Sequence, residues 1–350
     1  MSLVARAFVK SAVGAARFRL TGRRAPLSVT LAITRRCDTM CRYCDAPAST
    51  TELAANEWLE VIDELAALGC NRVIFGGAEP LLRPELPAFL DRCRDHGMWT
   101  VVETNGHAIP QRVQDLLSAC RLMISIDGCE SVHDAQREPG SFAKATAGLR
   151  EARKNGIEVG IITLLTRLNA DRWQETLDLA EQFGCSASFQ PLWPTGPIAS
   201  RGARRLAADD ATLHRSMLGI LEAKQAGRPV AMSEKTLRHL LNWDNHSVPT
   251  RAEPVDDLVC MAGQVSCAVD ANGDIAHCGP RLGSERPDAP GRANVRDGGF
   301  LQAFSRLADN SCHACTSTAC TEASFLYNLN SPVVIEFARA GTRILWRGAA

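Results

Sequence analysis

Hydrophobic positions follow two alternating patterns from residue 28 onward. Short apolar runs such as SVTLAIT (28–34) and RLMISID (121–127) are typical of buried strands, and the segments between such runs repeat apolar residues at helical spacing, as Trp58 and Leu65 do. We expect strands at 28–34, 71–75, 98–104, 121–127, 157–166 and 187–192, and helices at 51–68, 84–96, 110–119, 142–155, 171–183 and 208–226. Strands that alternate with helices predict a parallel sheet with right-handed crossovers. Six units rather than eight predict an α/β fold with an open, partial (βα)6 TIM-like barrel.

Two Pro-rich or Gly-rich segments, PLWPTGPIASRG (191–202) and RAEPVDD (251–257), interrupt this pattern. The chain has 350 residues, which is more than the roughly 250–300 that one hydrophobic core supports. We therefore expect a barrel with a small C-terminal Cys-rich cluster-binding domain. The expected units are a basic segment at 1–27, the barrel core at 28–205, a helical connection at 206–257, the Cys-rich domain at 258–325 and a C-terminal helix and tail at 326–350.

The first 27 residues contain six basic side chains and no acidic one. The basic residues are Arg6, Lys10, Arg17, Arg19, Arg23 and Arg24. One interpretation is a helix that contacts an anionic membrane surface or steers an anionic substrate. The other is a solvated helix packed on the barrel. Because the whole chain has 39 basic and 39 acidic residues, no nucleic-acid partner is expected. Without a signal peptide or an 18-residue apolar run, we expect a cytoplasmic protein, peripheral to the membrane under the first interpretation.

Three cysteines follow the first predicted strand directly. Cys37, Cys41 and Cys44 form a C-xxx-C-xx-C pattern, and the carboxyl ends of parallel strands are where such sheets carry their chemistry. A four-iron cluster held by three thiolates keeps one iron open for another ligand. The alternatives are half of a zinc site and an ordinary loop with buried cysteines.

At this point the chain resembles the radical SAM superfamily, whose signature is this cysteine pattern after the first strand of a partial barrel. Tyr43 occupies the aromatic position before the third cysteine, which the resemblance places near the adenine of S-adenosylmethionine (SAM). FGGAEPLLRPEL (75–86) is similar to the glycine-rich motif that meets the SAM amino group. Ala78 replaces the second glycine of the usual Gly-Gly-Glu-Pro form, so the resemblance assigns that role to Gly77 and Glu79.

Other motifs extend the resemblance over about residues 28–200. TNG (104–106) and SIDG (125–128) stand where the family has them, which implies that Ser125 and Asp127 contact the SAM ribose or the substrate. Arg137 is similar to an arginine near the SAM carboxylate. The resemblance implies reductive cleavage of SAM by a 4Fe–4S cluster, a 5′-deoxyadenosyl radical that abstracts hydrogen from an unactivated C–H bond, and a flavodoxin- or ferredoxin-type electron donor.

Six further cysteines lie within about 60 residues near the C-terminus, more than core packing needs. They are Cys260, Cys267, Cys278, Cys312, Cys315 and Cys320. SCAVDANGDIAHC (266–278) predicts a hairpin with an Asn-Gly turn. The region resembles the SPASM or shorter twitch extension of radical SAM enzymes, which implies an auxiliary 4Fe–4S cluster held by Cys260, Cys278, Cys312 and Cys315. Cys267 and Cys320 are then alternative ligands or part of a second cluster, and a zinc ribbon is the competing interpretation.

The substrate is less constrained than the cofactors. The basic N-terminus and the apolar, Arg-bearing C-terminal tail favour a lipid or another small metabolite as substrate. The alternatives are a ribosomal-peptide maturase that works with a separate recognition partner, and an iron–sulfur electron carrier or regulator with a degenerate SAM site. Candidate general bases are Glu103, Asp270, Asp274 and Glu322. We expect Cys70, Cys93, Cys120, Cys129 and Cys185 to be small core residues rather than ligands.

Overall fold

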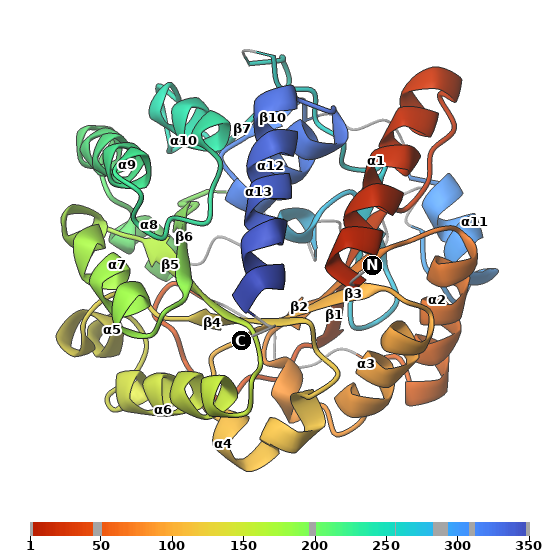
Figure 1. The fold of residues 1–350 in the computed structure, drawn as a ribbon, viewed down its shortest axis with the longest axis horizontal. Helices are drawn as coiled ribbons and strands as arrows, with labels where there is room; N and C mark the ends of the chain where they lie inside the picture. Colours follow the sequence, from red (N-terminus) through yellow and green to blue (C-terminus); the bar gives the residue numbers. More distant parts are fainter. Residues whose placement is uncertain are drawn as a thin grey trace.

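An eight-stranded sheet with the strand order β6-β5-β4-β3-β2-β1-β8-β9 organises the protein (Figure 1). We describe it from a computed structural model, in which residues 3–44, 51–195, 201–255, 257–282, 293–307 and 312–347 are placed. The first six strands are β1 (Ser28–Thr34), β2 (Arg72–Gly77), β3 (Trp99–Thr104), β4 (Arg121–Ser125), β5 (Val159–Leu165) and β6 (Ser186–Pro191). All five pairings between them are parallel, which confirms the predicted topology.

Helices cover the outer face of these strands, as the alternation predicted (Figure 1). They are α2 (Ala55–Ala67), α3 (Leu86–Asp95), α4 (Ile109–Arg112), α5 (Glu130–Gln136), α6 (Ser141–Lys154), α7 (Trp173–Gln182), α8 (Arg201–Leu206), α9 (Asp210–Gln225) and α10 (Glu234–Leu241). Short 3-10 turns lie at Pro80–Leu82 (η1), Val113–Leu116 (η2), Ala170–Arg172 (η3) and Gly279–Arg281 (η4). The helix expected at 110–119 is a single α-turn followed by η2, and α5 was not predicted.

The main hydrophobic core lies between the strands and these helices. Trp58 of α2, Phe75 of β2 and Phe89 of α3 are fully buried there, and the two phenylalanine rings stack with centroids 6.5 Å apart. The opposite face of the strands points into the barrel, and its side chains keep some contact with solvent. On β6, for example, Ala187 and Phe189 are buried whereas Ser186 and Ser188 are half-buried.

The C-terminal part of the chain continues the same sheet. β8 (Ser266–Val269) pairs in parallel with β1, and β9 (Ile275–Ala276) pairs antiparallel with β8, which confirms the predicted hairpin. Its turn contains Gly273 at φ +92°, a conformation that favours glycine. The remaining elements are β7 (Thr250–Arg251), α11 (Gly299–Ser305), β10 (Ala314–Cys315), α12 (Thr318–Tyr327) and α13 (Ser331–Arg347).

Helix α12 packs against the other edge of the six parallel strands. The Thr318 backbone N–H donates to Gln190 Oε1 at 2.7 Å, and the Thr318 hydroxyl donates to the Phe189 carbonyl at 2.8 Å. Since β8 pairs with β1 and α12 contacts β6, the C-terminal segment touches both edge strands of the six-stranded barrel. The C-terminal helix expected within 326–350 corresponds to α13.

Helix α1 (Leu3–Thr21) packs on α12 and α13, as Figure 1 shows. The Ser11 hydroxyl donates to Asn71 Oδ1 at 2.7 Å, next to the start of β2. After the helix, Arg24 donates to the carbonyl oxygens of Phe304 at 3.2 Å and Leu307 at 3.0 Å. The N-terminal segment is therefore anchored to both the barrel and the C-terminal segment. No helix in the described ranges is long and apolar enough to cross a membrane.

Candidate functional site

The three cysteines after β1 lie on one loop. The Cys44 backbone N–H donates to the Cys41 carbonyl at 3.0 Å, and the side chains of Cys37 and Cys44 are exposed while that of Cys41 is half-buried. Partial burial raises the pKa of Cys37 to about 11 and also raises the pKa of Cys41. Both thiols are thus protonated in the metal-free chain at neutral pH, and metal binding must release these protons because the thiolate is the ligand.

Residues from β3 and α5 hold this loop in place. The Asn105 amide donates to Asp38 Oδ1 at 2.7 Å and to Thr39 Oγ1 at 3.0 Å, and both acceptors lie between the first two cysteines. On the other side, the Arg42 backbone N–H donates to the Gln136 carbonyl at 2.9 Å. The loop is therefore tied to the residue that follows β3 and to the end of α5.

A buried ion pair lies beside the same loop. Arg137 Nε donates to Asp127 Oδ2 at 2.8 Å, and the two side chains are 9% and 0% exposed. The Tyr43 hydroxyl donates to the same oxygen at 3.0 Å, and Arg137 Nη1 lies 3.7 Å from Cys41 Sγ. Burial alone would raise the pKa of Asp127, but the Arg137 guanidinium outweighs it and lowers that pKa. The structure thus brings together three of the residues that the sequence singled out for SAM.

The glycine-rich segment after β2 packs closely against the end of β1. Gly77 has φ +108°, and a Cβ there would lie 2.6 Å from the Thr34 carbonyl oxygen, so only glycine fits without rearrangement. The Ala78 backbone N–H donates to that same oxygen at 3.1 Å. Alanine is accommodated at the position where the family motif has its second glycine, because the close approach falls on Gly77.

Glu79 is buried and accepts three hydrogen bonds. Its donors are the backbone N–H groups of Asn105 at 2.7 Å and Leu81 at 3.0 Å, and the Thr104 hydroxyl at 2.8 Å. Burial raises the pKa of Glu79 to about 7 even though these hydrogen bonds oppose the shift. The carboxylate therefore joins the glycine-rich segment to the TNG segment. Ser125, the last residue of β4, is half-buried and pairs with Ile162 in the ladder between β4 and β5.

Five of the six C-terminal cysteines lie together. Cys320 is at the centre of this group, where hydrogen bonds from the Cys278 and Cys315 thiols hold its pKa well below the ordinary value. Burial raises the pKa of Cys260 and Cys312, and the nearby charge of Cys320 raises both further. In the described part of the chain, no three His, Cys, Asp or Glu side chains are arranged to hold a single metal ion. Four thiolates around a four-iron cluster are a different arrangement, because the cluster separates its ligands.

The sixth of these cysteines is elsewhere. Cys267 lies on β8, where it is 3% exposed and part of the main hydrophobic core, and the nearest thiol to influence it is Cys70. The structure therefore does not bring Cys267 to the other five. Cys70, Cys93 and Cys185 are buried in the same core, as the sequence predicted, whereas Cys120 and Cys129 are half-buried.

The four candidate general bases have different surroundings. Asp270 forms an ion pair with Arg35 through two hydrogen bonds, one of them 2.7 Å long, and Asp274 accepts a hydrogen bond from Asn294 at 2.9 Å within the hairpin turn. Glu322, on α12, accepts a hydrogen bond from the backbone N–H of Ser233, which precedes α10, and burial raises the pKa of Glu322 to about 7. Glu103 lies inside the barrel on β3.

The sequence analysis missed the residues that connect these parts. Asn105 lies within the TNG segment but was not named, and Glu52, which accepts from the Thr34 hydroxyl at 2.6 Å and from Arg83 at 3.0 Å, has no local motif. The Arg35–Asp270 pair joins the loop before Cys37 to the hairpin of the C-terminal segment. The two partners of each of these contacts are far apart in the sequence. Only Asn105, because it belongs to the TNG segment, carried a signal that a motif search could have used.

Comparisons with known proteins agree with this geometry. Residues 31–180 match the model of the family described as the Radical SAM superfamily. An AdoMet-dependent heme synthase of Methanosarcina barkeri is 31% identical over 273 residues, which cover 73% of this chain and 77% of that protein. The mycofactocin maturase MftC of Mycobacterium ulcerans is 27% identical over 73% of this chain and 69% of its own length. The Fe-coproporphyrin III synthase of Methanosarcina barkeri is 32% identical, but the match spans only 40% of that protein.

Solved structures share the fold. Streptococcus suis SuiB bound to S-adenosylmethionine superposes with a TM-score of 0.62 at 16% identity, over 83% of this chain and 68% of that one. The enzyme anSMEcpe with bound AdoMet gives a TM-score of 0.61 at 14% identity, over 88% of this chain and 98% of that one. These likenesses establish the partial-barrel architecture that the alternating pattern predicted.

Proposed function

The chain belongs to the radical SAM superfamily, whose enzymes use a 4Fe–4S cluster and S-adenosylmethionine, and from this premise we propose that Cys37, Cys41 and Cys44 hold that cluster. The observation that carries the proposal is the loop itself, which Asn105 and Arg42 tie to the ends of neighbouring elements. Three thiolates on such a loop keep one iron open for SAM. When bound, these groups supply a 5′-deoxyadenosyl radical that abstracts hydrogen from an unactivated C–H bond.

We propose that six residues around the loop bind SAM. Tyr43 donates to Asp127, and Asp127 is paired with Arg137, which contacts Cys41. Gly77 and Glu79 line the glycine-rich turn. A carboxylate whose pKa is about 7 suits a cationic amino group, because the cation favours the ionised form. The Arg137 guanidinium offers donors to the SAM carboxylate, and half-buried Ser125 offers a hydroxyl to the ribose or the substrate.

We propose one auxiliary 4Fe–4S cluster in segment 258–325, held by four of the five grouped thiols. Cys320 joins Cys260, Cys278, Cys312 and Cys315 as a candidate, because its thiol contacts two of them, and Cys267 is proposed as a core residue. The cluster serves either electron transfer or substrate positioning. A flavodoxin- or ferredoxin-type protein is the proposed source of the electron for SAM cleavage.

Anaerobic reconstitution tests both clusters. We expect about eight irons per chain, since each cluster holds four, and release of 5′-deoxyadenosine with SAM and dithionite. Replacing all three loop cysteines by alanine should remove about four irons and all SAM cleavage. Cys320→Ser should lower the auxiliary iron, whereas Cys93→Ser, in the hydrophobic core, should not. An unchanged iron content in the triple variant would refute the proposal, and loaded clusters that release no 5′-deoxyadenosine would favour an electron carrier.

The substrate is proposed as a lipid or another small metabolite, with a peptide as the competing class. Among the relatives, the PqqA peptide cyclase of Bradyrhizobium diazoefficiens is 32% identical over 44% of this chain, and one SuiB structure holds a precursor peptide. Those names support a peptide maturase with a separate recognition partner as the second proposal. Transfer of deuterium from a labelled candidate into 5′-deoxyadenosine discriminates among the classes.

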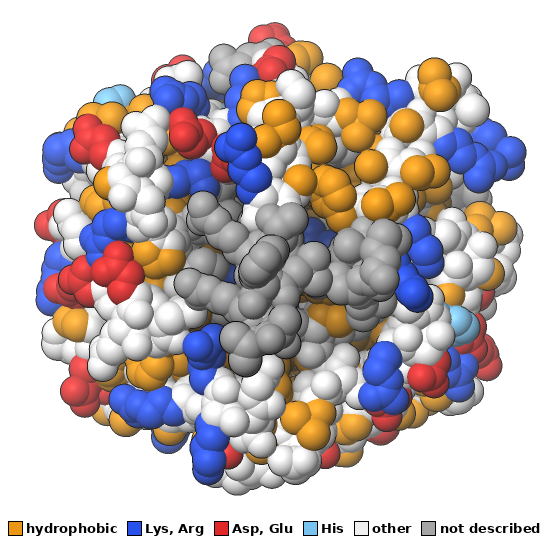
Figure 2. All heavy atoms as spheres, in the orientation of Figure 1, with side chains coloured by type: hydrophobic (Ala, Val, Ile, Leu, Met, Phe, Trp, Pro, Cys, Tyr) orange, Lys and Arg blue, Asp and Glu red, His pale blue; other side chains and the backbone are white. Residues whose placement is uncertain are grey.

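We also propose that α1 contacts an anionic membrane surface. Val9 and Val13 are 48% and 63% exposed beside Lys10 and Arg17 on the solvent face of the helix, and Leu20 is 86% exposed. Figure 2 shows hydrophobic side chains gathered over α1 and its neighbours, with basic side chains close by. Exposed apolar residues among cations are typical of helices that lie in the membrane interface.

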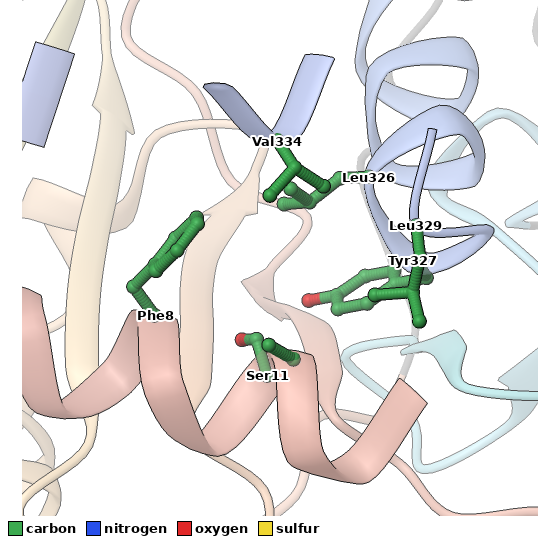
Figure 3. Close-up of a pocket in the computed structure, with 7 residues that line it drawn as sticks. Phe8, Ser11, Leu326, Tyr327, Leu329 and Val334 are labelled. Atoms are coloured by element: carbon green, nitrogen blue, oxygen red, sulfur yellow. The ribbon is translucent and has the colours of Figure 1, made fainter. Parts of the chain in front are cut away.

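A small apolar pocket lies between α1 and the two C-terminal helices (Figure 3). Its lining residues are Phe8, Ser11, Ala12, Leu326, Tyr327, Leu329 and Val334. We expect the protein to sediment with vesicles of phosphatidylglycerol and phosphatidylcholine, and Val13→Asp to reduce this. Leu117→Asp, at an equally exposed leucine, is the matched control. Equal sedimentation of wild type and Val13→Asp, or none with wild type, would refute membrane contact.

A further inference from the structure

The interior of the barrel is lined by small and polar side chains. A filled barrel packs bulky branched residues inside. Here most of the residues that align with Glu103 across the neighbouring strands have small side chains. Alternate residues of β4 and β6 face the interior. The residues that align with Glu103 are Ala32, Gly76, Met123, Gly160 and Ser186. Glu103, Met123 and Ser186 are half-buried, so the interior keeps contact with solvent, although the Arg121 guanidinium and the Met123 side chain fill the space over Gly160.

Glu103 projects into this interior without a partner. Its neighbours Val102 and Thr104 are buried on the other face of β3, and a Cβ on Gly76 would lie 3.3 Å from Glu103 Oε2. No residue in the described ranges forms a hydrogen bond or an ion pair with this carboxylate. Burial raises the pKa of Glu103, although Arg72 opposes the shift. Glu103 is half-buried, so its carboxylate oxygens stay available to accept hydrogen bonds from a ligand.

Two arginines lie further toward the start of the strands. The Arg121 guanidinium donates to the Ser186 hydroxyl at 2.8 Å, and its Nε is buried without a partner. Arg72 lies over the Trp99 ring at 5.3 Å, and its Nε is also buried without a partner. Neither guanidinium forms an ion pair with a carboxylate that the structure describes. Val101 faces Arg121 in the sheet, so Glu103 and Arg121 are two residues, about 7 Å, apart along the barrel axis.

We propose that Glu103 and Arg121 bind the substrate inside the barrel, and that the substrate carries both an amine and a carboxylate. The carboxylate of Glu103 accepts from the amine, and the Arg121 guanidinium donates to the substrate carboxylate, with Arg72 adding positive charge. Among the described residues neither charge has an ion-pair partner, and an amphoteric molecule would pair both at once. The inference rests on the proposed radical SAM function, because Glu103 directly precedes Thr104 and Asn105, which hold Glu79.

The test uses the reconstituted holoenzyme with SAM, dithionite and a perdeuterated trileucine probe. Abstraction moves one deuterium from a probe C–D bond to the 5′ carbon, and mass spectrometry detects monodeuterated 5′-deoxyadenosine. We expect transfer from the probe with free ends, and at least about tenfold less after N-acetylation or C-terminal amidation, since a hydrogen bond to a charged group contributes about that factor. Glu103→Gln should abolish the preference for the free amine, and Arg121→Met the preference for the free carboxylate.

The possible outcomes distinguish a failure of the amphoteric substrate site from a failure of the proposed radical SAM function. Glu103→Asp keeps the charge and should retain part of the amine preference, which a purely structural role would not explain; it also serves if the Gln variant does not load its clusters. Glu60→Gln, on the exposed face of α2, is the control. Transfer that ignores the blocking groups, or 5′-deoxyadenosine without deuterium from any probe, overturns the amphoteric site. No 5′-deoxyadenosine at all, despite loaded clusters, instead refutes the proposed function.

Discussion

Removing the charge of Asp127 should destabilise the metal-free chain through Arg137. Asp127→Asn keeps the shape of the side chain but leaves a buried guanidinium, 9% exposed, without its counter-ion. The hydrogen bond from Tyr43 and the contact of Arg137 with Cys41 depend on the same carboxylate. The substitution therefore acts on fold stability and on the cysteine loop together.

The expected cost follows from the burial of the pair. Breaking a buried ion pair by removing one partner costs about 3–5 kcal/mol, because the remaining charge stays uncompensated. With 350 residues, an unfolding entropy of about 2 cal/mol/K per residue converts this loss into a decrease in Tm of roughly 4–7 °C. The pKa of Asp127 is lowered in the folded state, so its contribution is present above the unfolded pKa of about 4 and is lost as the pH falls below it.

Thermal and urea unfolding, followed by circular dichroism under reducing conditions, measures this cost. The double variant Asp127→Asn/Arg137→Met removes both charges and should recover part of the loss, since no uncompensated charge remains. Lys154→Gln breaks an ion pair whose lysine is 77% exposed and should cost less than about 1 kcal/mol. The gap between wild type and Asp127→Asn should stay constant from pH 6 to 8 and shrink below about pH 4.

Two results would contradict this reasoning. If Asp127→Asn costs no more than the Lys154 control, the pair does not support the fold. If the double variant loses the full sum of both single losses, the two side chains act independently, and the coupling inferred from the 2.8 Å contact is wrong.

Three further predictions concern other parts of the fold. Gly77→Ala should lower the free energy of unfolding by about 1–3 kcal/mol, measured with urea, because the added Cβ would meet the Thr34 carbonyl oxygen at a backbone φ of +108°. Gly97 also has a positive φ but has free space around it, so Gly97→Ala is the control. The raised pKa of Glu79 makes the protonated form favour folding, so the metal-free chain should lose about 3 kcal/mol of stability as the pH rises from 4.5 through 7; equal stability at pH 5 and 8 would contradict this. Arg24→Met removes the hydrogen bonds to the end of α11, and limited proteolysis should then cut near α1 faster than in wild type.

Local sequence patterns were sufficient to predict elements that depend on residues close together in the chain. Apolar runs and helical spacing located all six parallel strands, and the Asn-Gly pair located the hairpin turn. The pattern failed where length and polarity gave weak periodicity. α5 (Glu130–Gln136) is short and polar, and the helix expected at 110–119 changes to a 3-10 turn at Val113. Boundaries of that kind depend on packing against neighbours rather than on the segment itself.

Cysteine spacing identified two groups of cysteines but did not determine which residues belong to the second group. The loop motif needed only consecutive residues, so the sequence by itself determined which three thiols share a loop. Cys267 and Cys320 looked equivalent along the chain, yet β8 turns Cys267 into the core, whereas α12 brings Cys320 to Cys278 and Cys315. That choice depends on strand alternation and helix placement, which act between distant segments.

The sequence determined the alternating strands and the first cysteine loop, because each of these depends on residues close together in the chain. Only the tertiary structure decided that the hairpin of the C-terminal segment pairs with β1, that Asp127 meets Arg137 beside Cys41, and that Glu103 and Arg121 lie near each other on adjacent strands without an ion-pair partner among the described residues. The physical reason is that charges and ladder hydrogen bonds are satisfied by whatever the folded chain brings within a few ångströms, irrespective of separation in sequence.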